Sequence, residues 1–191
     1  MAVPPPSPAP DKAALRRWAR AARDAFAASA PPPVAPPARW IELLRPGLVV
    51  ASYRPVGSEA DPAFLAEAAL ERGCALALPH VVDRAGTMRF LAWHPDHALV
   101  AGPFGLEQPH HGRDEVAPDV ILTPLVGFDA ALHRLGQGAG HYDRAFAGLP
   151  EALRIGVAWS VQHVDPLPID RWDVPLHAVI TEQGWIERME P

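Results

Sequence analysis

Short apolar segments alternate with helical segments after residue 47, and this alternation limits the chain of 191 residues to few architectures. Continuous apolar strands separated by helices are typical of a mainly parallel sheet that is covered on both faces. We therefore predict an α/β domain of three layers, an open, mainly parallel sheet with helices on both faces. The expected strands are 47–53, 74–82, 88–93, 119–126, 154–160 and 177–181, and 61–71 is expected to be a helix with Asp61 as its N-cap. Such sheets bind ligands outside the carboxyl ends of their strands, so a site is expected in the loops that follow these segments.

Prolines divide the sequence into regions. Many of the 24 prolines lie in 1–10 and 31–37, where an extended chain is expected because proline fixes φ and has no N–H. We predict a flexible leader over 1–10 and a single domain over 11–191, with 31–37 as an extended connector.

Composition narrows the functional classes. The net charge of -5 argues against a general nucleic-acid-binding protein, which needs a basic surface to neutralise phosphates. The single cysteine, Cys74, cannot form an internal disulfide, and no apolar run approaches the roughly 20 residues of a membrane span. We expect a cytoplasmic monomer that binds small molecules and neither nucleic acid nor membrane.

Residues 11–28 have the period of a helix with two different faces. Apolar side chains fall on one face, whereas Lys12, Arg16, Arg20 and Arg23 fall within an arc of about 80° on another. Lys12 is the single lysine beside 16 arginines, which suggests that a compact ammonium group is needed there. Two interpretations stay open: a solvated basic face, as most such stripes are, or a helix that presents Lys12 and Arg16 to a nucleoside triphosphate.

A glycine-rich loop is the strongest functional signal in the chain. Gly136, Gly138 and Gly140 alternate after an expected strand and before an expected short helix that begins near His141 or Tyr142. Glycines let backbone amides approach phosphate oxygens, and the N-terminus of a helix adds partial positive charge. The loop has neither the Gly-Lys-Ser/Thr ending of a Walker loop nor the spacing of the dinucleotide fingerprint G-x-G-x-x-G.

Charged residues flank this loop. Arg134 and Arg144 can pair with phosphate through planar guanidinium groups, and Asp143 suits magnesium held by one or two carboxylates and substrate phosphates. Without them, a plain glycine-rich turn would be an equal interpretation. Together they predict a phosphate cradle.

Several motifs spread over nearly the whole chain are shared with one known family. They are Lys12-x-x-Leu15-Arg16, 53–59, Pro124, Phe128-Asp129, Arg134-Leu135-Gly136-x-Gly138-x-Gly140-x-Tyr142-Asp143-Arg144, Gln162, Pro168, Asp173 and 180–182. On these motifs the chain resembles the 5-formyltetrahydrofolate cyclo-ligases, also called methenyltetrahydrofolate synthetases. The resemblance implies a NagB/RpiA-like α/β fold and the ATP- and Mg²⁺-dependent conversion of 5-formyltetrahydrofolate to 5,10-methenyltetrahydrofolate, with phosphorylation of the formyl oxygen and with ADP and phosphate as products.

The resemblance also implies roles for particular residues. The implied catalytic residues are Lys12, Arg134 and Arg144. The implied ATP-binding residues are Lys12, Arg16, Arg134, Leu135, Gly136, Gln137, Gly138, Ala139, Gly140, His141 and Tyr142. The implied folate-binding residues are Tyr53, Arg54, Glu59, Gln137, Gly138, Ala139, Gly140 and His141, and the implied Mg²⁺ ligands are Asp143 and Asp173.

Four positions depart from the family pattern. Leu132 stands in place of a glycine, Gln137 of an aromatic residue, His141 of a tyrosine and Trp172 of a histidine. One alternative is therefore a diverged, non-catalytic module that binds nucleotide or reduced folate. A weaker alternative is sugar-phosphate or coenzyme A chemistry on a similar scaffold, which predicts no ATP binding.

Overall fold

The computed structural model describes residues 11–83 and 86–188, and the leader predicted over 1–10 lies outside them. The elements are α1 (Lys12–Ala28), α2 (Ala38–Leu43), β1 (Val49–Ala51), α3 (Ala63–Glu71), β2 (Ala75–His80), β3 (Arg89–Trp93), β4 (Val100–Ala101), the 3-10 turn η1 (Pro103–Gly105), β5 (Glu107–Gln108), β6 (Val120–Pro124), β7 (Gly127–Phe128), β8 (Arg134–Leu135), α4 (His141–Gly148), β9 (Leu153–Val157), the 3-10 turn η2 (Ser160–Gln162), β10 (Ala178–Thr181) and β11 (Gly184–Glu187).

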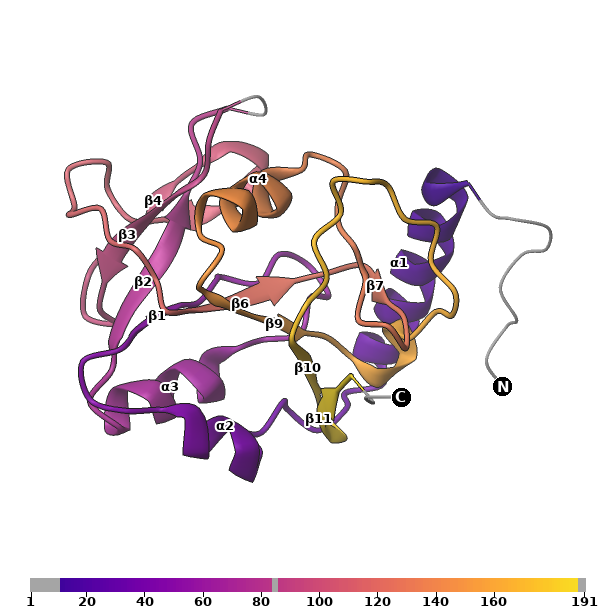
Figure 1. Cartoon of the computed structure of the whole chain (residues 1–191), viewed down its shortest axis with the longest axis horizontal. Coiled ribbons are helices and arrows are strands. Elements are labelled where there is room, and N and C mark those ends of the chain that lie inside the picture. The colour runs from indigo at the N-terminus through magenta and orange to yellow at the C-terminus, as the bar shows by residue number, and fades with distance from the viewer. Residues whose placement is uncertain (1–10, 84–85, 189–191) are drawn as a thin grey trace.

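A seven-stranded sheet forms the middle layer of the molecule (Figure 1). Its strand order is β11-β10-β9-β6-β1-β2-β3, with parallel pairing from β10 through to β2 and antiparallel pairing of β3 and β11 at the two edges. The predicted α/β class with a mainly parallel sheet is confirmed. The strands are shorter than the apolar segments that predicted them, by four residues in β1 and by one residue in β3 and in β10.

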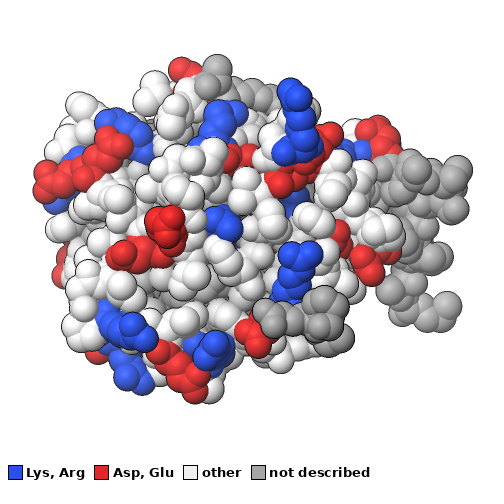
Figure 2. Space-filling model, in the orientation of Figure 1, with Lys and Arg blue, Asp and Glu red and all other residues white. Residues whose placement is uncertain are grey.

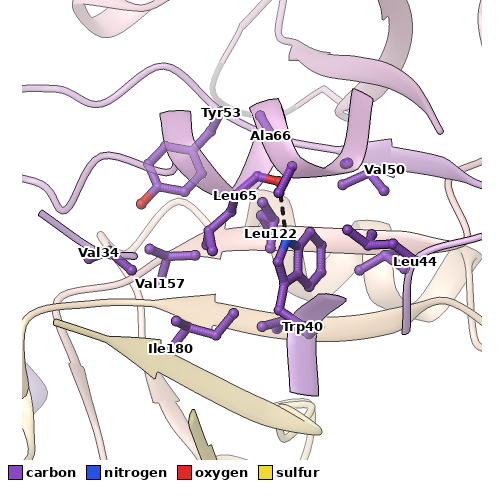
Figure 3. Packing of buried hydrophobic residues seen from close by; sticks show 14 of the residues in the cluster. Val34, Trp40, Leu44, Val50, Tyr53, Leu65, Ala66, Leu122, Val157 and Ile180 are labelled. Carbon is purple, nitrogen blue, oxygen red and sulfur yellow. Dashed lines mark hydrogen bonds between the residues drawn. The ribbon is translucent and has the colours of Figure 1, made fainter. Parts of the chain in front are cut away.

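One face of the sheet is covered by α2 and α3. Val50 and Leu122 point from β1 and β6 into a cluster that contains Trp40 of α2 and Leu65 of α3 (Figure 3). The Trp40 side chain is fully buried, and its indole N–H donates to the Leu65 carbonyl at 3.1 Å, so this large apolar group leaves no unpaired donor. Helix α2 was not expected from the sequence.

The other face is covered by α4. Ala51 and Ile121, the neighbours of Val50 and Leu122 in their strands, pack in a second cluster with Phe146 of α4. Successive side chains of a strand point to opposite faces, so these apolar segments fill two cores at once. The predicted three-layer arrangement follows from that double burial, and Figure 1 shows α4 on the opposite side of the sheet from α2 and α3.

Helix α1 packs beside the β7–β8 hairpin. Leu15 and Ala19 are fully buried in a third cluster, against apolar residues of that hairpin and of the segment after η2. The Asp11 side chain accepts a hydrogen bond from the Ala13 N–H at 3.1 Å and caps the helix. The helix predicted over 11–28 is confirmed, whereas the helix predicted from Asp61 begins two residues later, at Ala63, whose N–H the Asp61 carboxylate accepts.

A two-stranded hairpin, β7–β8, separates β6 from the glycine-rich loop. Leu132 lies in its turn with φ of 61°, in the left-handed region that favours glycine, and its side chain is fully buried. This is the position where the family pattern has glycine. The backbone therefore keeps a glycine-like conformation although leucine occupies it.

At position 132, a glycine variant should be more stable than an alanine variant, the reverse of the usual order. Leu132→Ala should lower the free energy of unfolding by about 3 kcal/mol, because it empties a buried site and keeps the strained φ. Leu132→Gly removes the same side chain but relieves the strain, so it should be about 1 kcal/mol more stable than the alanine variant. Urea unfolding of both variants measures the difference, and an alanine variant as stable as the glycine variant would contradict the role assigned to this φ.

Acidic and basic side chains are interspersed on the face of the molecule drawn in Figure 2. Residues 30–37, which contain the proline-rich connector, form neither helix nor strand. Within the described residues, every helix is too short or too polar to cross a membrane.

Candidate active site

A cavity of about 610 Å³ opens at the carboxyl ends of β1, β2 and β6. Strand β1 lies between β2 and β6 in the sheet, so the chain extends the sheet first to one side of β1 and later to the other. A crevice at such a change of direction is where open α/β sheets bind ligands. The residues of the predicted site that line it are Lys12, Arg16, Tyr53, Arg54, Glu59, 134–143 and Asp173.

The glycine-rich loop forms one wall of the cavity. Gly138 has φ of 102°, and Gly140, with φ of 70°, is the N-cap of α4, so both adopt conformations that strain any residue with a side chain. The Gly136 carbonyl accepts a hydrogen bond from the Arg16 Nε–H at 2.8 Å, which ties the loop to α1. The loop thus joins a glycine backbone to a helix N-terminus, the combination that suits phosphate oxygens.

Lys12 lies at one end of this wall, between two carboxylates. Its ammonium group is 2.6 Å from Asp170 and 2.6 Å from Asp173. Burial by itself would lower the pKa of Lys12, but the hydrogen bonds and charges of Asp170 and Asp173 raise this pKa above its ordinary value. Lys12 is therefore a permanent cation at the mouth of the cavity.

Arg134 is a buried cation on β8. Its side chain is 5% exposed and packs over the rings of Tyr142 and Phe146, with its guanidinium carbon 5.5 Å and 5.2 Å from their centroids. One Nη2–H donates to Asp143 at 2.5 Å, whereas the buried Nε has no hydrogen-bond partner. A buried donor without a partner is costly, so Arg134 has unused capacity to bind an anion.

Glu59 forms the carboxylate end of the cavity, and its side chain is 9% exposed. It accepts hydrogen bonds from the Val56 N–H at 3.0 Å and from the Gln137 amide at 3.2 Å. The Gln137 oxygen in turn accepts two hydrogen bonds from Arg20 of α1. A carboxylate offers about four acceptor positions, so roughly two remain for a ligand with a pair of N–H donors.

Two tyrosines, the buried Tyr53 and the half-buried Tyr142, lie close to this carboxylate. Burial raises the pKa of Tyr53 and of Tyr142 well above the ordinary value, and the negative charge of Glu59 raises both further. The Tyr53 hydroxyl donates to the Ala60 carbonyl at 2.5 Å. Both phenols therefore stay neutral at physiological pH and do not serve as bases there.

The two predicted metal ligands line the same cavity, but each is paired with a cation, Asp143 with Arg134 and Asp173 with Lys12. Among the described residues, no group of three or more His, Cys, Asp or Glu side chains is arranged to hold a metal ion. This arrangement fits Mg²⁺, which is commonly held by one or two carboxylates together with substrate phosphates and water. A metal would then arrive with its nucleotide.

Arg144 does not line the cavity, unlike the other predicted site residues. Its guanidinium group donates to the carbonyls of Ala139, at 3.0 Å, and Gly86, at 3.3 Å. In this structure Arg144 therefore supports the glycine-rich loop.

The structure adds residues to the site that the sequence did not single out for it. Asp170 shares Lys12 with Asp173, and Arg20 holds Gln137; Arg20 belongs to the cationic stripe of α1, which was the available signal. The further lining side chains come mostly from loops and short strands, and of these only Val56, Pro124 and Trp172 belong to positions compared with the family pattern. They are Val56, Pro79, Val81, Met88, Phe104, Leu106, Glu107, Pro124 and Trp172.

Fold and cavity define an α/β protein with a cation-lined cleft for an anionic ligand next to a buried carboxylate. The chain belongs to the 5-formyltetrahydrofolate cyclo-ligase family, whose family model matches residues 11–182. It is 34% identical over 156 residues to the 5-formyltetrahydrofolate cyclo-ligase of Mycolicibacterium smegmatis, which covers 77% of this chain and 80% of that protein. It is 39% identical over 103 residues to the 5-formyltetrahydrofolate cyclo-ligase of Escherichia coli, a match to 51% of this chain and 57% of the relative.

A solved structure supports the same family. The NMR structure of Aquifex aeolicus 5,10-methenyltetrahydrofolate synthetase is similar with a TM-score of 0.71 and 26% sequence identity, over 94% of both chains. By sequence, the chain spans a little over half of the length of the Escherichia coli relative that it matches.

Proposed function

We propose that this protein uses ATP to convert 5-formyltetrahydrofolate to 5,10-methenyltetrahydrofolate, with ADP and phosphate as the other products. The observation that carries the proposal is one cavity that joins the glycine-rich loop and its cations to the carboxylate of Glu59. The names of the relatives support the same reaction.

The phosphate end of the cavity would hold the triphosphate of ATP. Lys12 and Arg134 supply positive charge, and the backbone N–H groups around Gly138 supply short-range donors. Arg16 acts mainly by fixing the loop through the Gly136 carbonyl. When bound, Mg²⁺ would neutralise phosphate charge, with Asp143 and Asp173 as its protein ligands.

The carboxylate end would hold the pterin ring of the folate. The ring's amino group and its neighbouring N–H form a pair of donors, which matches the acceptor positions left on Glu59. Apolar side chains including Val56, Met88 and Leu106 line the cavity and offer contacts for the rest of the ring system.

The reaction needs positioning and charge neutralisation more than covalent help from the protein. The formyl oxygen forms a bond to the terminal phosphorus of ATP, and ADP leaves. The nitrogen of the para-aminobenzoyl group then adds to the formyl carbon, the carbon–oxygen bond to phosphate breaks, and the nitrogen proton is released. Lys12 and Arg134 would stabilise the charge on the transferred phosphoryl group.

A direct assay tests this proposal. Purified protein with 5-formyltetrahydrofolate and Mg²⁺ should form the methenyl product, followed by its absorbance, with ATP present and not without it. Folded protein that binds nucleotide or folate tightly but forms no product would favour the non-catalytic binding module instead. Turnover without ATP would contradict the phosphate cradle.

Mg²⁺, a monomeric state and a cytoplasmic setting belong to the same proposal. Omission of Mg²⁺ from the assay tests the first, and the second is tested by the mass measured in light scattering after gel filtration.

A further inference from the structure

We propose that Arg23 of α1 is a positioning residue for Glu59 that holds this carboxylate oriented for the folate. The inference rests on the proposed function, because it concerns the carboxylate end of the same cavity. Arg23 itself does not line the cavity, so it would act through Glu59.

Arg23 is a buried charge in an unusual place. It lies on the cationic stripe of α1, yet its side chain is only 8% exposed. It is buried like the apolar residues Leu15 and Ala19 of the same helix. Its Nε–H donates to the Ser58 hydroxyl at 2.9 Å, and Ser58 also hydrogen-bonds to Asp24. A long cationic side chain is rarely buried without a partner that requires it.

Two carboxylates lie near the Arg23 guanidinium group, the exposed Asp24 at 4.0 Å from Nε and the buried Glu59, and Glu59 is the one that shares its buried environment. The Arg23 Nη1 lies 3.8 Å from the Glu59 carboxylate, and both side chains are at least nine-tenths buried. Nη1 makes no hydrogen bond, although Nε is satisfied by Ser58. The guanidinium group therefore offers Glu59 a charge and a donor that is not committed to another acceptor. Loss of that charge and donor would leave the buried Glu59 carboxylate less well fixed for the pterin donors.

Helix α1, which carries Arg23, contributes side chains to both ends of the cavity. Lys12 and Arg16, two to three turns earlier on the same helix, reach the phosphate end of the cavity. One rigid helix thus supports both ends, and it does so through different side chains. A change at Arg23 should therefore affect folate and ATP unequally.

Two substitutions at Arg23 separate its charge from its bulk. Arg23→Met keeps an unbranched apolar stem without charge, whereas Arg23→Lys keeps the charge. We expect Arg23→Met to weaken 5-formyltetrahydrofolate binding, and to raise its KM, by about tenfold or more, with the KM for ATP changed less than about twofold. Arg23→Lys should recover most of the loss, and Arg17→Met, at an exposed position of the same helix, should match the wild type.

The measurements are the Kd of 5-formyltetrahydrofolate by calorimetry and both KM values, with thermal melting to check the fold. Equal changes in both KM values, an unchanged folate Kd in Arg23→Met, or no recovery in Arg23→Lys would overturn the role of Arg23. If Arg23→Met does not fold, Arg23→Gln, which keeps a donor for Ser58 but no charge, takes its place with the same expectation.

These measurements distinguish failure of this inference from failure of the proposed function. If the wild-type protein binds the folate but does not turn it over, the proposed reaction is contradicted. The Kd values still decide the role of Arg23 in that case. A wild-type protein that does not bind 5-formyltetrahydrofolate overturns both.

Discussion

Replacing Arg134 with alanine is expected to lower kcat/KM by about 10²- to 10³-fold, the loss found when one preorganised donor leaves a charge-stabilising site. Arg134 is almost fully buried, contacts Asp143 at 2.5 Å and keeps its Nε without a partner. This unpaired donor is therefore available to an incoming phosphoryl group. Initial rates over a range of ATP concentrations measure the effect.

Arg89→Ala is the matched control for Arg134→Ala. Arg89 lies on β3, outside the cavity, in a half-exposed ion pair with Glu115 at 3.3 Å. Such surface pairs contribute about 0–1 kcal/mol to stability, so its rate should stay within about twofold of the wild type. Comparable losses in both variants, or an Arg134→Ala protein with full activity, would refute the role given to Arg134.

Substitutions at the two ends of the cavity should separate the two substrates. Glu59→Ala removes the acceptor of a pair of charge-assisted hydrogen bonds, so the KM for 5-formyltetrahydrofolate should rise about 100-fold while the KM for ATP changes little. Lys12→Ala should do the reverse and raise the KM for ATP by about 10- to 100-fold, because one cation at the phosphate end is lost. Steady-state kinetics with each substrate varied in turn gives all four values.

Glu67→Gln, on the exposed side of α3, controls for the loss of one negative charge and should leave both KM values unchanged. The division of the cavity into a phosphate end and a folate end fails if Glu59→Ala and Lys12→Ala raise the same KM, or if each raises both equally.

The sequence predicted the parts of this site that depend on local spacing. Apolar segments gave the parallel sheet, and the location at the carboxyl ends of its strands followed from that sheet. The alternating glycines and the lone lysine indicated the phosphate end. Glycine exposes backbone N–H groups and lysine carries a positive charge wherever the fold places them. Gly138 and Gly140 indeed have positive φ.

The parts that depend on distant contacts could not be predicted. Arg134 and Arg144 flank the same loop and look equivalent in sequence, yet only Arg134 lines the cavity, whereas Arg144 binds the Ala139 carbonyl of the loop. The difference arises from β8, which faces Arg134 toward α4, and from the turn of α4 that carries Arg144. Likewise, the burial of Arg23 follows from its packing against Ser58 and Glu59, which helical period alone does not show.

The fold accommodates the residues that depart from the family pattern. Leu132 keeps the left-handed backbone of the glycine it replaces and fills the core beneath the hairpin. Gln137 links Arg20 to Glu59, so a polar contact stands where the family pattern has an aromatic residue. Gln137, His141 and Trp172 line the cavity and leave it open.

Calorimetric titration with a non-hydrolysable ATP analogue and Mg²⁺ tests the central claim most directly. We predict saturable one-to-one binding to the wild-type protein and loss of that binding in Gly138→Val, since a branched residue cannot adopt φ of 102° without displacing the loop amides. Melting curves should show that Gly138→Val stays folded. A wild-type protein that does not bind the analogue, or a folded Gly138→Val protein that binds it as tightly as the wild type, would contradict the account.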